Sequence, residues 1–503
     1  MKIQILSSYR PGLVFLLSAT ALLILAYFSV GYYHPDEHFQ ILEFARWKLD
    51  PSRVEPLPWE FYQQMRPAIQ PAMVVALHNM LAPIGAGDPF LITFFLRILS
   101  AGISFLSMWM IYRQYSKQIS DEILKKWFLL LSFLLWFALY NAVRFSSETW
   151  SGALFIIGFS YLFILKRRLL NIDFLLTGLL LGFSFLFRYQ SGFLIAGFFT
   201  WFLVHRMILF KDAPASPGLL PGTKVKIVQL VLMVTGIVGA IAIGVLIDKW
   251  FYGRWVLAAW NYFEQNILAD KISGFGIEPW WFYFEDIFIR AIPPFSLVFI
   301  IGSLITFILL RNDLLTWTLV PFILIHFVIS HKETRFFYPL IGFLPILVIK
   351  GMERVKDLWK VPVLENKFIM VFAKIFWIVN CTFIVIVFFI PADSQVNIYR
   401  KIFHQYPYPA TLYYFSDDPY HRALDISYYK RSDLVIRKAE TVAGLDSVPE
   451  KKYLIAIKGS HMEIGKLKKF KCVYSTYPEW VKHFNLNNWL DRTQVWYIYE
   501  IEN

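Results

Sequence analysis

The sequence has few charged residues and almost no cysteine. Asp, Glu, Lys and Arg make up 17% of the 503 residues, too few to cover a soluble chain of this length. The two cysteines, Cys381 and Cys472, form no CxxC pair, so we expect neither a disulfide framework nor a cysteine-based metal site. The net charge is +13, yet the sequence contains no nucleic-acid-binding motif, and we expect no nucleic-acid partner.

Apolar residues, in contrast, are abundant and occur in long runs. Hydrophobic residues make up 57% of the chain, in repeated runs of about twenty residues that can each cross a hydrocarbon core of about 30 Å. The N-terminal run resembles a signal peptide but has no small-x-small cleavage site after it, so we interpret it as a retained span. Lys and Arg cluster in alternate connections, which the positive-inside rule places in the cytoplasm. Eleven spans satisfy this alternation: 12–30, 90–112, 127–143, 150–165, 172–187, 191–210, 227–247, 287–310, 314–330, 336–350 and 369–390.

This topology predicts two domains. Residues 1–390 form an all-α, polytopic membrane domain, whose loops 31–89 and 248–286 face outward. Residues 391–503 also face outward. They contain β-rich runs at 452–459 and 493–502, which indicate a small mixed α/β domain.

The same topology places many ionisable side chains at the outer ends of spans or in outer loops. Such groups are costly at the edge of the bilayer unless they pair or face a cavity, so we expect one outward-facing polar site. Its candidate members are His34, Asp36, Glu37, Arg66, Arg144, Glu148, Arg188, Asp248, Arg254, His331, Lys332, Glu333 and Arg335.

Adjacent carboxylates follow the first span in YHPDEHFQILEFA (residues 33–45). One of Asp36 and Glu37 could remove a proton from a hydroxyl while the other orients the loop, as sugar transfer from an activated phosphate requires. Alternatively, Asp36 is the N-cap of the helix that follows.

Basic side chains occur in three further motifs. Arg66 lies in MRPAIQPAM (residues 65–73), Arg188 in FRYQSG (187–192), and His331, Lys332, Glu333 and Arg335 in SHKETRFFYP (330–339). Arg and Lys suit phosphate recognition, but interfacial anchoring or a salt-bridged turn would explain the same residues. The histidines lack the helical spacing of a zinc protease motif, so we expect no metal.

The outer loop at 248–281 is rich in aromatic residues, Asn and Gly. Aromatic rings can stack on sugar faces, although an aromatic belt at the bilayer interface needs no ligand. We interpret the loop as sugar-binding, and the candidates for contact with sugar are His34, Trp255, Asn261, Asn266, Trp280 and Glu333.

Four of these motifs occur together in one order: HPDE (34–37), RPAIQP (66–71), a YG…W…N…N…G…PW series (252–280) and HKETRF (331–336). In this the chain resembles the mannosyltransferases of glycosyltransferase family 22. The resemblance implies a GT-C fold and an inverting transfer of mannose from a polyprenyl- or dolichyl-phosphate donor to a glycan or glycolipid. It also implies Asp36 as the base, Glu37 as its support, basic residues on the donor phosphate and no metal or other cofactor.

The segment RFSSET (144–149) departs from the family pattern, which usually has an Asn and a longer spacing between its Arg and Glu. This departure, and the lack of a lysine-based retrieval signal, favour a bacterial plasma membrane over the endoplasmic reticulum. The rival interpretation is a lipid-carrier translocator, which would tolerate Asp36→Asn far better than an enzyme that uses Asp36 as its base.

Overall fold

The computed structural model describes residues 11–52, 55–165, 167–204, 225–359, 367–406, 410–415, 417–441, 445, 452–458, 470–478, 480, 483–484 and 495–501. The chain forms two compact units. Unit 1 comprises Met1–Tyr27, Gln63–Ala72 and Phe95–Phe389, and unit 2 comprises Phe28–Tyr62, Met73–Phe94 and Ile390–Asn503. The predicted outer loop 31–89 is therefore divided between the two units.

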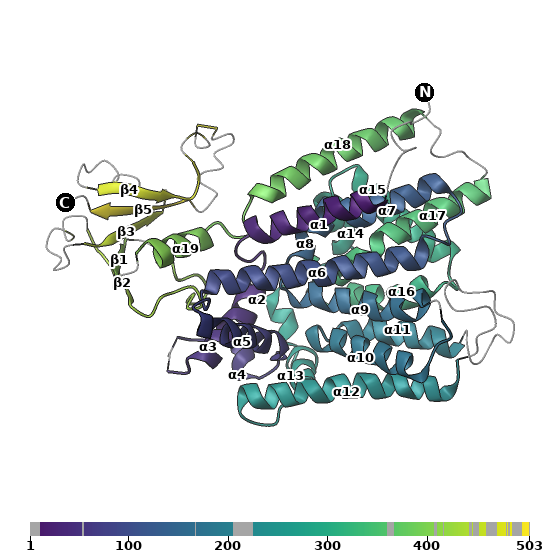
Figure 1. Cartoon of the computed structure of the whole chain (residues 1–503), viewed down its shortest axis with the longest axis horizontal. Coiled ribbons are helices and arrows are strands. Elements are labelled where there is room, and N and C mark those ends of the chain that lie inside the picture. The colour runs from purple at the N-terminus through teal and green to yellow at the C-terminus, as the bar shows by residue number, and fades with distance from the viewer. Residues whose placement is uncertain are drawn as a thin grey trace. The chain divides into compact units, whose positions relative to one another are not determined.

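Unit 1 is built from helices, many of them apolar and long (Figure 1). It contains α1 (Pro11–Phe28), most of α6 (Pro89–Tyr115), α7 (Glu122–Leu134), α8 (Trp136–Ala142), α9 (Ser147–Ile164), α10 (Asn171–Phe187), α11 (Ser191–Leu203), α12 (Ile227–Tyr252), α13 (Ala258–Phe263), α14 (Phe282–Arg290), α15 (Phe295–Leu309), α16 (Leu314–Val328), α17 (Leu344–Trp359) and α18 (Lys367–Phe389). Two π-helical or 3₁₀ segments, η5 (Glu264–Leu268) and η6 (Lys271–Phe275), follow α13, and the 3₁₀ segment η7 (Thr334–Phe343) leads into α17.

Within the described residues, helices occupy each of the eleven predicted spans in whole or in part, and they differ in length; residues 205–210 of the span 191–210 lie outside the described part. Within the described residues, six are long and apolar enough to cross a membrane alone, and two bent pairs, α7 with α8 and α15 with α16, raise the number to eight. The pairs bend by 42° and 117°. The predicted span 287–310 is interrupted after α14 because Pro293 and Pro294 precede α15. The multi-span, mostly helical class predicted from the sequence is confirmed.

The closest helix packing in unit 1 uses glycine. α10 packs against α9 and α12, α11 against α16, and α15 against α17. A Cβ at Gly178 of α10 would lie 1.9 Å from the Met233 carbonyl oxygen of α12, and one at Gly236 would lie 2.3 Å from the Leu175 carbonyl oxygen. The two backbones therefore touch, as small residues permit between membrane helices.

Unit 2 combines the segment after α1 with the C-terminal part of the chain. Its helical elements are α2 (Pro35–Glu37), η2 (His38–Leu42, π-helical), α3 (Glu43–Leu49), α4 (Trp59–Tyr62), most of α5 (Ile69–Leu81), η3 (Ala82–Ile84) and α19 (Val396–Gln405). The Glu43 carboxylate, 4% exposed, accepts hydrogen bonds from the backbone N–H groups of Ser427 and Tyr428 at 2.8 and 3.0 Å. The same Oε1 lies 2.7 Å from Nε2 of the buried His38.

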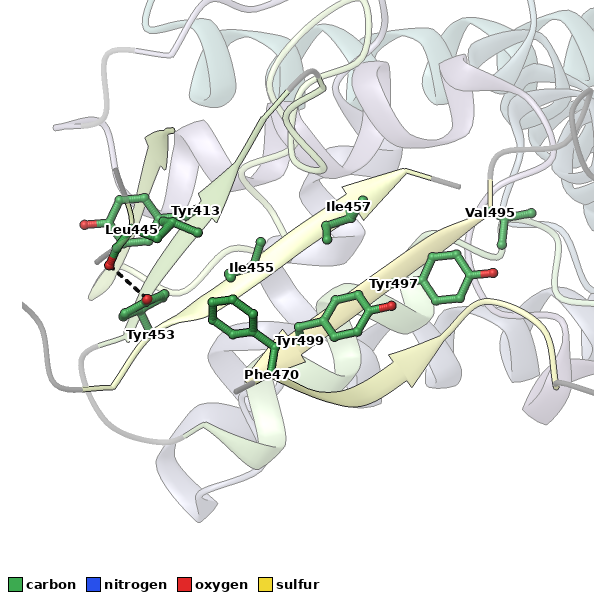
Figure 2. Packing of buried hydrophobic residues seen from close by; sticks show 9 residues of the cluster. All are labelled: Tyr413, Leu445, Tyr453, Ile455, Ile457, Phe470, Val495, Tyr497 and Tyr499. Carbon is green, nitrogen blue, oxygen red and sulfur yellow. Dashed lines mark hydrogen bonds between the residues drawn. The ribbon is translucent and has the colours of Figure 1, made fainter. Parts of the chain in front are cut away.

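The C-terminal part of unit 2 contains a mixed sheet of five strands in the order β2-β1-β3-β5-β4. β1 (Ala410–Tyr414) pairs in parallel with β2 (Leu434–Lys438) and β3 (Leu454–Lys458), whereas β5 (Trp496–Ile501) is antiparallel to β3 and to β4 (Phe470–Ser475). Figure 2 shows the side chains that cover one face, with Tyr453 Oη donating to the Leu445 carbonyl at 3.1 Å. The predicted β-rich runs become β3 and β5, which confirms a mixed sheet in the C-terminal part of the chain; residues 459, 493, 494 and 502 of those runs lie outside the described part.

Candidate active site

The first candidate residues lie in the turn that opens α2 in unit 2. His34 is the N-cap residue, and its Nδ1 accepts the backbone N–H of Asp36 at 3.2 Å. The Glu37 carboxylate faces back toward the backbone N–H groups of His34 and Tyr33, at 3.4 and 3.5 Å, and so completes a capping box. Pro35 occupies the first helical position, where its missing N–H costs nothing.

Asp36 thus enters the cap through its backbone N–H, and the alternative that Asp36 is the N-cap residue is wrong. The Asp36 Oδ1 lies 3.7 Å from His34 Nδ1, beyond hydrogen-bond range, and the side chain is 23% exposed. Because Nδ1 accepts an N–H, the ring proton of His34 is on Nε2. The two adjacent carboxylates, both partly exposed, therefore have different contacts: the Glu37 carboxylate closes the capping box, and the Asp36 carboxylate takes no part in it.

The second group of candidates forms a partly buried ionic cluster in unit 1, at the start of α9, the end of α10 and the segment that leads into the start of η7. Arg188 Nη1 lies 3.1 Å from Glu148 Oε1, and Arg335 Nη1 lies 3.5 Å from the same oxygen. Arg335 also pairs with Glu333, with Nε 2.5 Å from Oε2 and Nη2 3.0 Å from Oε1. His331 Nε2 lies 2.9 Å from Glu333 Oε1. The structure thus brings Arg188, His331, Glu333 and Arg335 together through Glu148.

Lys332 lies in the same segment but has different partners. Its Nζ donates to the carbonyl oxygens of Glu278 and Ile329, at 2.9 and 2.6 Å. Burial lowers the pKa of Lys332, and the Glu278 carboxylate opposes this shift. The two hydrogen-bond acceptors carry no formal charge, whereas the two arginines of the cluster each face a carboxylate.

Arg66 packs at another position in unit 1, where its guanidinium lies 5.6 Å from the ring centre of Tyr262. Its carbonyl accepts the Tyr252 hydroxyl at 2.7 Å, and the N–H of nearby Ala68 donates to the carboxylate of Asp248 at 2.7 Å. The two hydrogen bonds hold the start of the RPAIQP segment against the end of α12, and the Arg66 contact with Tyr262 holds it against α13.

The candidates in the aromatic loop fall into two kinds. The Nδ2 of Asn261 donates to the carbonyls of Gln63 and Gln64, at 3.1 and 3.2 Å, and that of Asn266 to its own helical turn. Both amides therefore hold the backbone. Trp255 and Trp280 are 64% and 59% exposed, and Lys249 Nζ lies 3.9 Å from the centre of the Trp255 ring. The exposed rings, rather than the amides, are placed to meet a ligand or the bilayer interface.

The sequence profile of the Alg9-like mannosyltransferase family matches residues 13–416. The chain belongs to this family, and the resemblance found in its motifs is confirmed. Two similar proteins are GPI alpha-1,2-mannosyltransferase 3 from Bos taurus and mannosyltransferase APTG1 from Arabidopsis thaliana. Each is 25% identical, over 67% of this chain and 58% of its own length. The chain therefore spans somewhat more than half the length of these relatives.

The fold resembles that of ArnT from Cupriavidus metallidurans, solved bound to undecaprenyl phosphate. The TM-score is 0.50 at 11% identity, with 97% of each chain covered. At this identity the likeness concerns the fold alone, and it confirms the GT-C architecture that the Alg9-like family resemblance implies.

Two residues of this family member were missed or misjudged from the sequence. Glu148 lies four positions after Arg144, a spacing that predicts a local pair on a helix, and in the structure it pairs with the distant Arg188 and Arg335. The role of Glu43 was missed, because its bonds to the C-terminal part of the chain leave no local pattern. In the described residues no three His, Cys, Asp or Glu side chains are grouped to hold a metal ion.

Proposed function

We propose that this chain is an inverting α-mannosyltransferase that moves mannose from a polyprenyl- or dolichyl-phosphate donor to a glycan or glycolipid on the outer or luminal face. Membership of the Alg9-like family, matched over residues 13–416, supports the transferred sugar. The fold that the chain shares with ArnT, which binds undecaprenyl phosphate, supports a lipid-phosphate donor.

The observation that carries the mechanism is that the two carboxylates of the α2 turn have different contacts. Glu37 and His34 make the capping box, and the Asp36 carboxylate takes no part in it. Asp36 takes the proton of an acceptor hydroxyl, whose oxygen then attacks the anomeric carbon of mannose opposite the phosphate. The bond from that carbon to the phosphate oxygen breaks, and the lipid phosphate leaves with the electron pair. One displacement on the opposite face inverts the configuration.

Lys332 is the strongest candidate for the donor phosphate, since its buried Nζ is held by neutral carbonyls. Arg188 and Arg335 hold Glu148 and contribute to the same electropositive surroundings, with His331 and Glu333 beside them. Arg66 is a further phosphate candidate, and the exposed Trp255 and Trp280 are candidates for contact with sugar.

We place the protein in a bacterial plasma membrane, with its site facing outward. The shortened RFSSET segment supports this choice, and the luminal face of the endoplasmic reticulum is the alternative.

The test uses full-length protein reconstituted with polyprenyl-phosphate mannose, labelled in the sugar, and a lipid extract of the host. Asp36→Asn should reduce the transfer rate by about 10²–10⁴-fold, the usual contribution of a general base. Glu37→Gln is the matched control: its amide oxygen still accepts the His34 N–H, so we expect a loss below about tenfold.

Normal transfer by Asp36→Asn would refute Asp36 as the base. A large loss in Glu37→Gln together with normal transfer in Asp36→Asn would move that role to Glu37. If neither variant nor the wild type transfers sugar from any lipid-phosphate donor, the enzyme assignment itself fails.

A further inference from the structure

Unit 2 contains an open groove between helix α19 and strand β4, and it includes none of the residues assigned to sugar transfer. Its volume is about 780 Å³, in the upper part of the range for ligand sites. Both walls belong to unit 2. Because the groove is open rather than enclosed, an extended ligand can enter it without a rearrangement of the protein.

Helix α19 forms one wall of the groove with its polar face. Its apolar face is buried, because Val396, Tyr399 and Ile402 are each 2% exposed or less. The residues of α19 that line the groove recur every three or four positions and share one face of the helix: Asn397, Arg400, Lys401, His404 and Gln405. The amphipathic sequence of α19 therefore places two amides and three basic side chains along the groove.

The side chains of Arg400 and Lys401 have no counter-charge within the described part of the chain. Neither forms an ion pair or a hydrogen bond with a described residue, and no acidic side chain is among the described residues that line the groove. His404 differs, because its Nε2 lies 3.2 Å from Asp88 Oδ2. The positive charge that the groove offers to a ligand is therefore that of Arg400 and Lys401.

The opposite wall is formed by β4 and the residues that follow it, from Cys472 to Pro478. It contains two partly buried tyrosines, Tyr474 and Tyr477. Burial raises the pKa of Tyr474 to about 12 and also raises that of Tyr477, so both phenols stay neutral at pH 7. Asp393, which also acts on Tyr474, is paired with Arg422 at 2.9 Å. The wall therefore offers aromatic surface without repelling an anion.

The two walls together match a glycan that carries negative charge. Carboxylate and phosphate groups accept charge-assisted hydrogen bonds from Arg and Lys. Sugar rings stack their C–H faces on aromatic rings. The side-chain amides of Asn397 and Gln405, which make no hydrogen bond to a described residue, can bind sugar hydroxyls. A neutral glycan would leave both cations without a counter-charge, and an inorganic anion would fill only a small part of the groove.

We propose that the groove between α19 and β4 binds an acidic glycan, whose carboxylate or phosphate groups contact Arg400 and Lys401. If the proposed function is correct, this glycan belongs to the acceptor, and that step alone rests on the proposed function. The C-terminal part of unit 2 would then select acceptors by their charge without taking part in the chemistry.

Cys472 provides a probe inside the groove. It is exposed, and Cys381 is the only other cysteine of the chain, so Cys381→Ser leaves a single thiol. The full-length protein, in nanodiscs of neutral phosphatidylcholine and without any donor, is alkylated with a water-soluble maleimide. A thiol covered by a ligand reacts only in the unoccupied fraction of the protein. We therefore expect saturating trigalacturonic acid to slow the reaction at least about tenfold, and maltotriose, a neutral trisaccharide, to change it less than about twofold.

Two substitutions on α19 test which side chains bind the acid. Arg400→Gln and Lys401→Gln should each raise the concentration of trigalacturonic acid for half protection by about tenfold, the loss of one charged hydrogen bond. Lys438→Gln is the matched control. It makes the same change of charge at an exposed position of β2, the opposite edge strand of the sheet, and should change that concentration less than about twofold. An unchanged alkylation rate without ligand shows that the wall is intact.

Three results would overturn the inference. The first is no protection of Cys472 by trigalacturonic acid or mannose 6-phosphate at millimolar concentration, and the second is equal protection by maltotriose. The third is equal half-protection of the wild type and of the double variant Arg400→Gln, Lys401→Gln. Protection by phosphatidylglycerol in the nanodisc would assign the groove to a lipid headgroup and reject a glycan. A failed transfer assay with intact protection would reject the proposed function alone, and normal transfer without protection would reject this site alone.

Discussion

At the scale of single residues, a buried cation can bind an anionic ligand only if carboxylates of the protein do not already neutralise its charge. Arg188 faces Glu148, and Arg335 faces both Glu148 and Glu333. The Lys332 ammonium donates hydrogen bonds to two neutral carbonyls, and the Glu278 carboxylate also acts on it. The arginines therefore serve mainly to hold the cluster, and Lys332 is the cation that a phosphate would complete.

Replacing Lys332 should separate binding from stability. We expect Lys332→Gln to lower kcat/KM for the lipid-phosphate donor by about 10–100-fold, since a charge-assisted contact is worth about 1.5–3 kcal/mol. Initial rates over a range of donor concentrations measure it. Lys117→Gln removes an exposed charge just after α6, away from every proposed site residue in sequence, and should change kcat/KM by less than about threefold. If both variants lose the same factor, Lys332 has no specific part in donor binding.

Arg188→Gln should lower the stability of the protein more than its affinity for the donor. It leaves Glu148, 3% exposed, without its nearer guanidinium, and breaking a buried pair costs about 3–5 kcal/mol. We therefore expect a lower midpoint of thermal unfolding in detergent, with Lys332→Gln closer to wild type. A stable Arg188→Gln protein with a raised KM for the donor would show that Arg188 binds phosphate directly.

The motifs were visible in the sequence, but the partners of their side chains were not. Arg188 and Glu148 are forty positions apart, and nothing local to FRYQSG indicates the carboxylate it meets. His38 and Glu43 are five positions apart, a spacing that brings side chains together through the π-helical turn η2 and not through an ordinary helix. Residue types at the site follow from sequence, whereas their pairing depends on tertiary structure.

At the scale of the elements, apolar runs located the helices well and their breaks poorly. The predicted spans 12–30, 90–112 and 227–247 correspond to α1, α6 and α12. The helix α15, in contrast, has only 15 residues, about 22 Å in length, and it meets α16 at a bend of 117°. Hydropathy averages over such a bend because both arms are apolar. Composition alone therefore could not separate a full crossing from a bent pair.

The glycine contacts between α10 and α12 predict which substitutions this helix pair tolerates. Gly236→Ala places a methyl group 2.3 Å from the Leu175 carbonyl oxygen and forces the helices apart, at a cost of about 1–3 kcal/mol. Gly239→Ala lies on the same helix with no atom within 4 Å, so we expect a neutral effect or a gain of about 0.5–1 kcal/mol from helix propensity. The midpoint of thermal unfolding in detergent distinguishes them. Equal midpoints would contradict backbone contact between α10 and α12.

At the scale of the whole molecule, the C-terminal sheet does not form a unit by itself. Unit 2 unites residues 390–503 with residues 28–62 and 73–94, most of which the sequence assigned to the outer loop 31–89 of the membrane domain. The N–H of Asp393 donates to the Val30 carbonyl at 3.1 Å, and Arg422 pairs with Asp393 at 2.9 Å. Gly31 has φ +88°, and a Cβ there would lie 2.7 Å from the Cβ of Asp393. Contacts between stretches so far apart in sequence leave no periodic signal.

A substitution of Glu43 tests how far the stability of unit 2 depends on one side chain from residues 28–62. Glu43→Ala leaves the buried N–H groups of Ser427 and Tyr428 without their acceptor, at about 1–3 kcal/mol each. The stretch around residue 428 should then open more often, and limited trypsin digestion of the full-length protein should cleave at Lys430 or Arg431 at least about tenfold faster. Glu440→Ala removes an exposed carboxylate just after β2 and should leave the cleavage rate near that of wild type. Equal cleavage of both variants would mean that the C-terminal part keeps its structure without the Glu43 carboxylate, as the two-domain prediction from sequence expects.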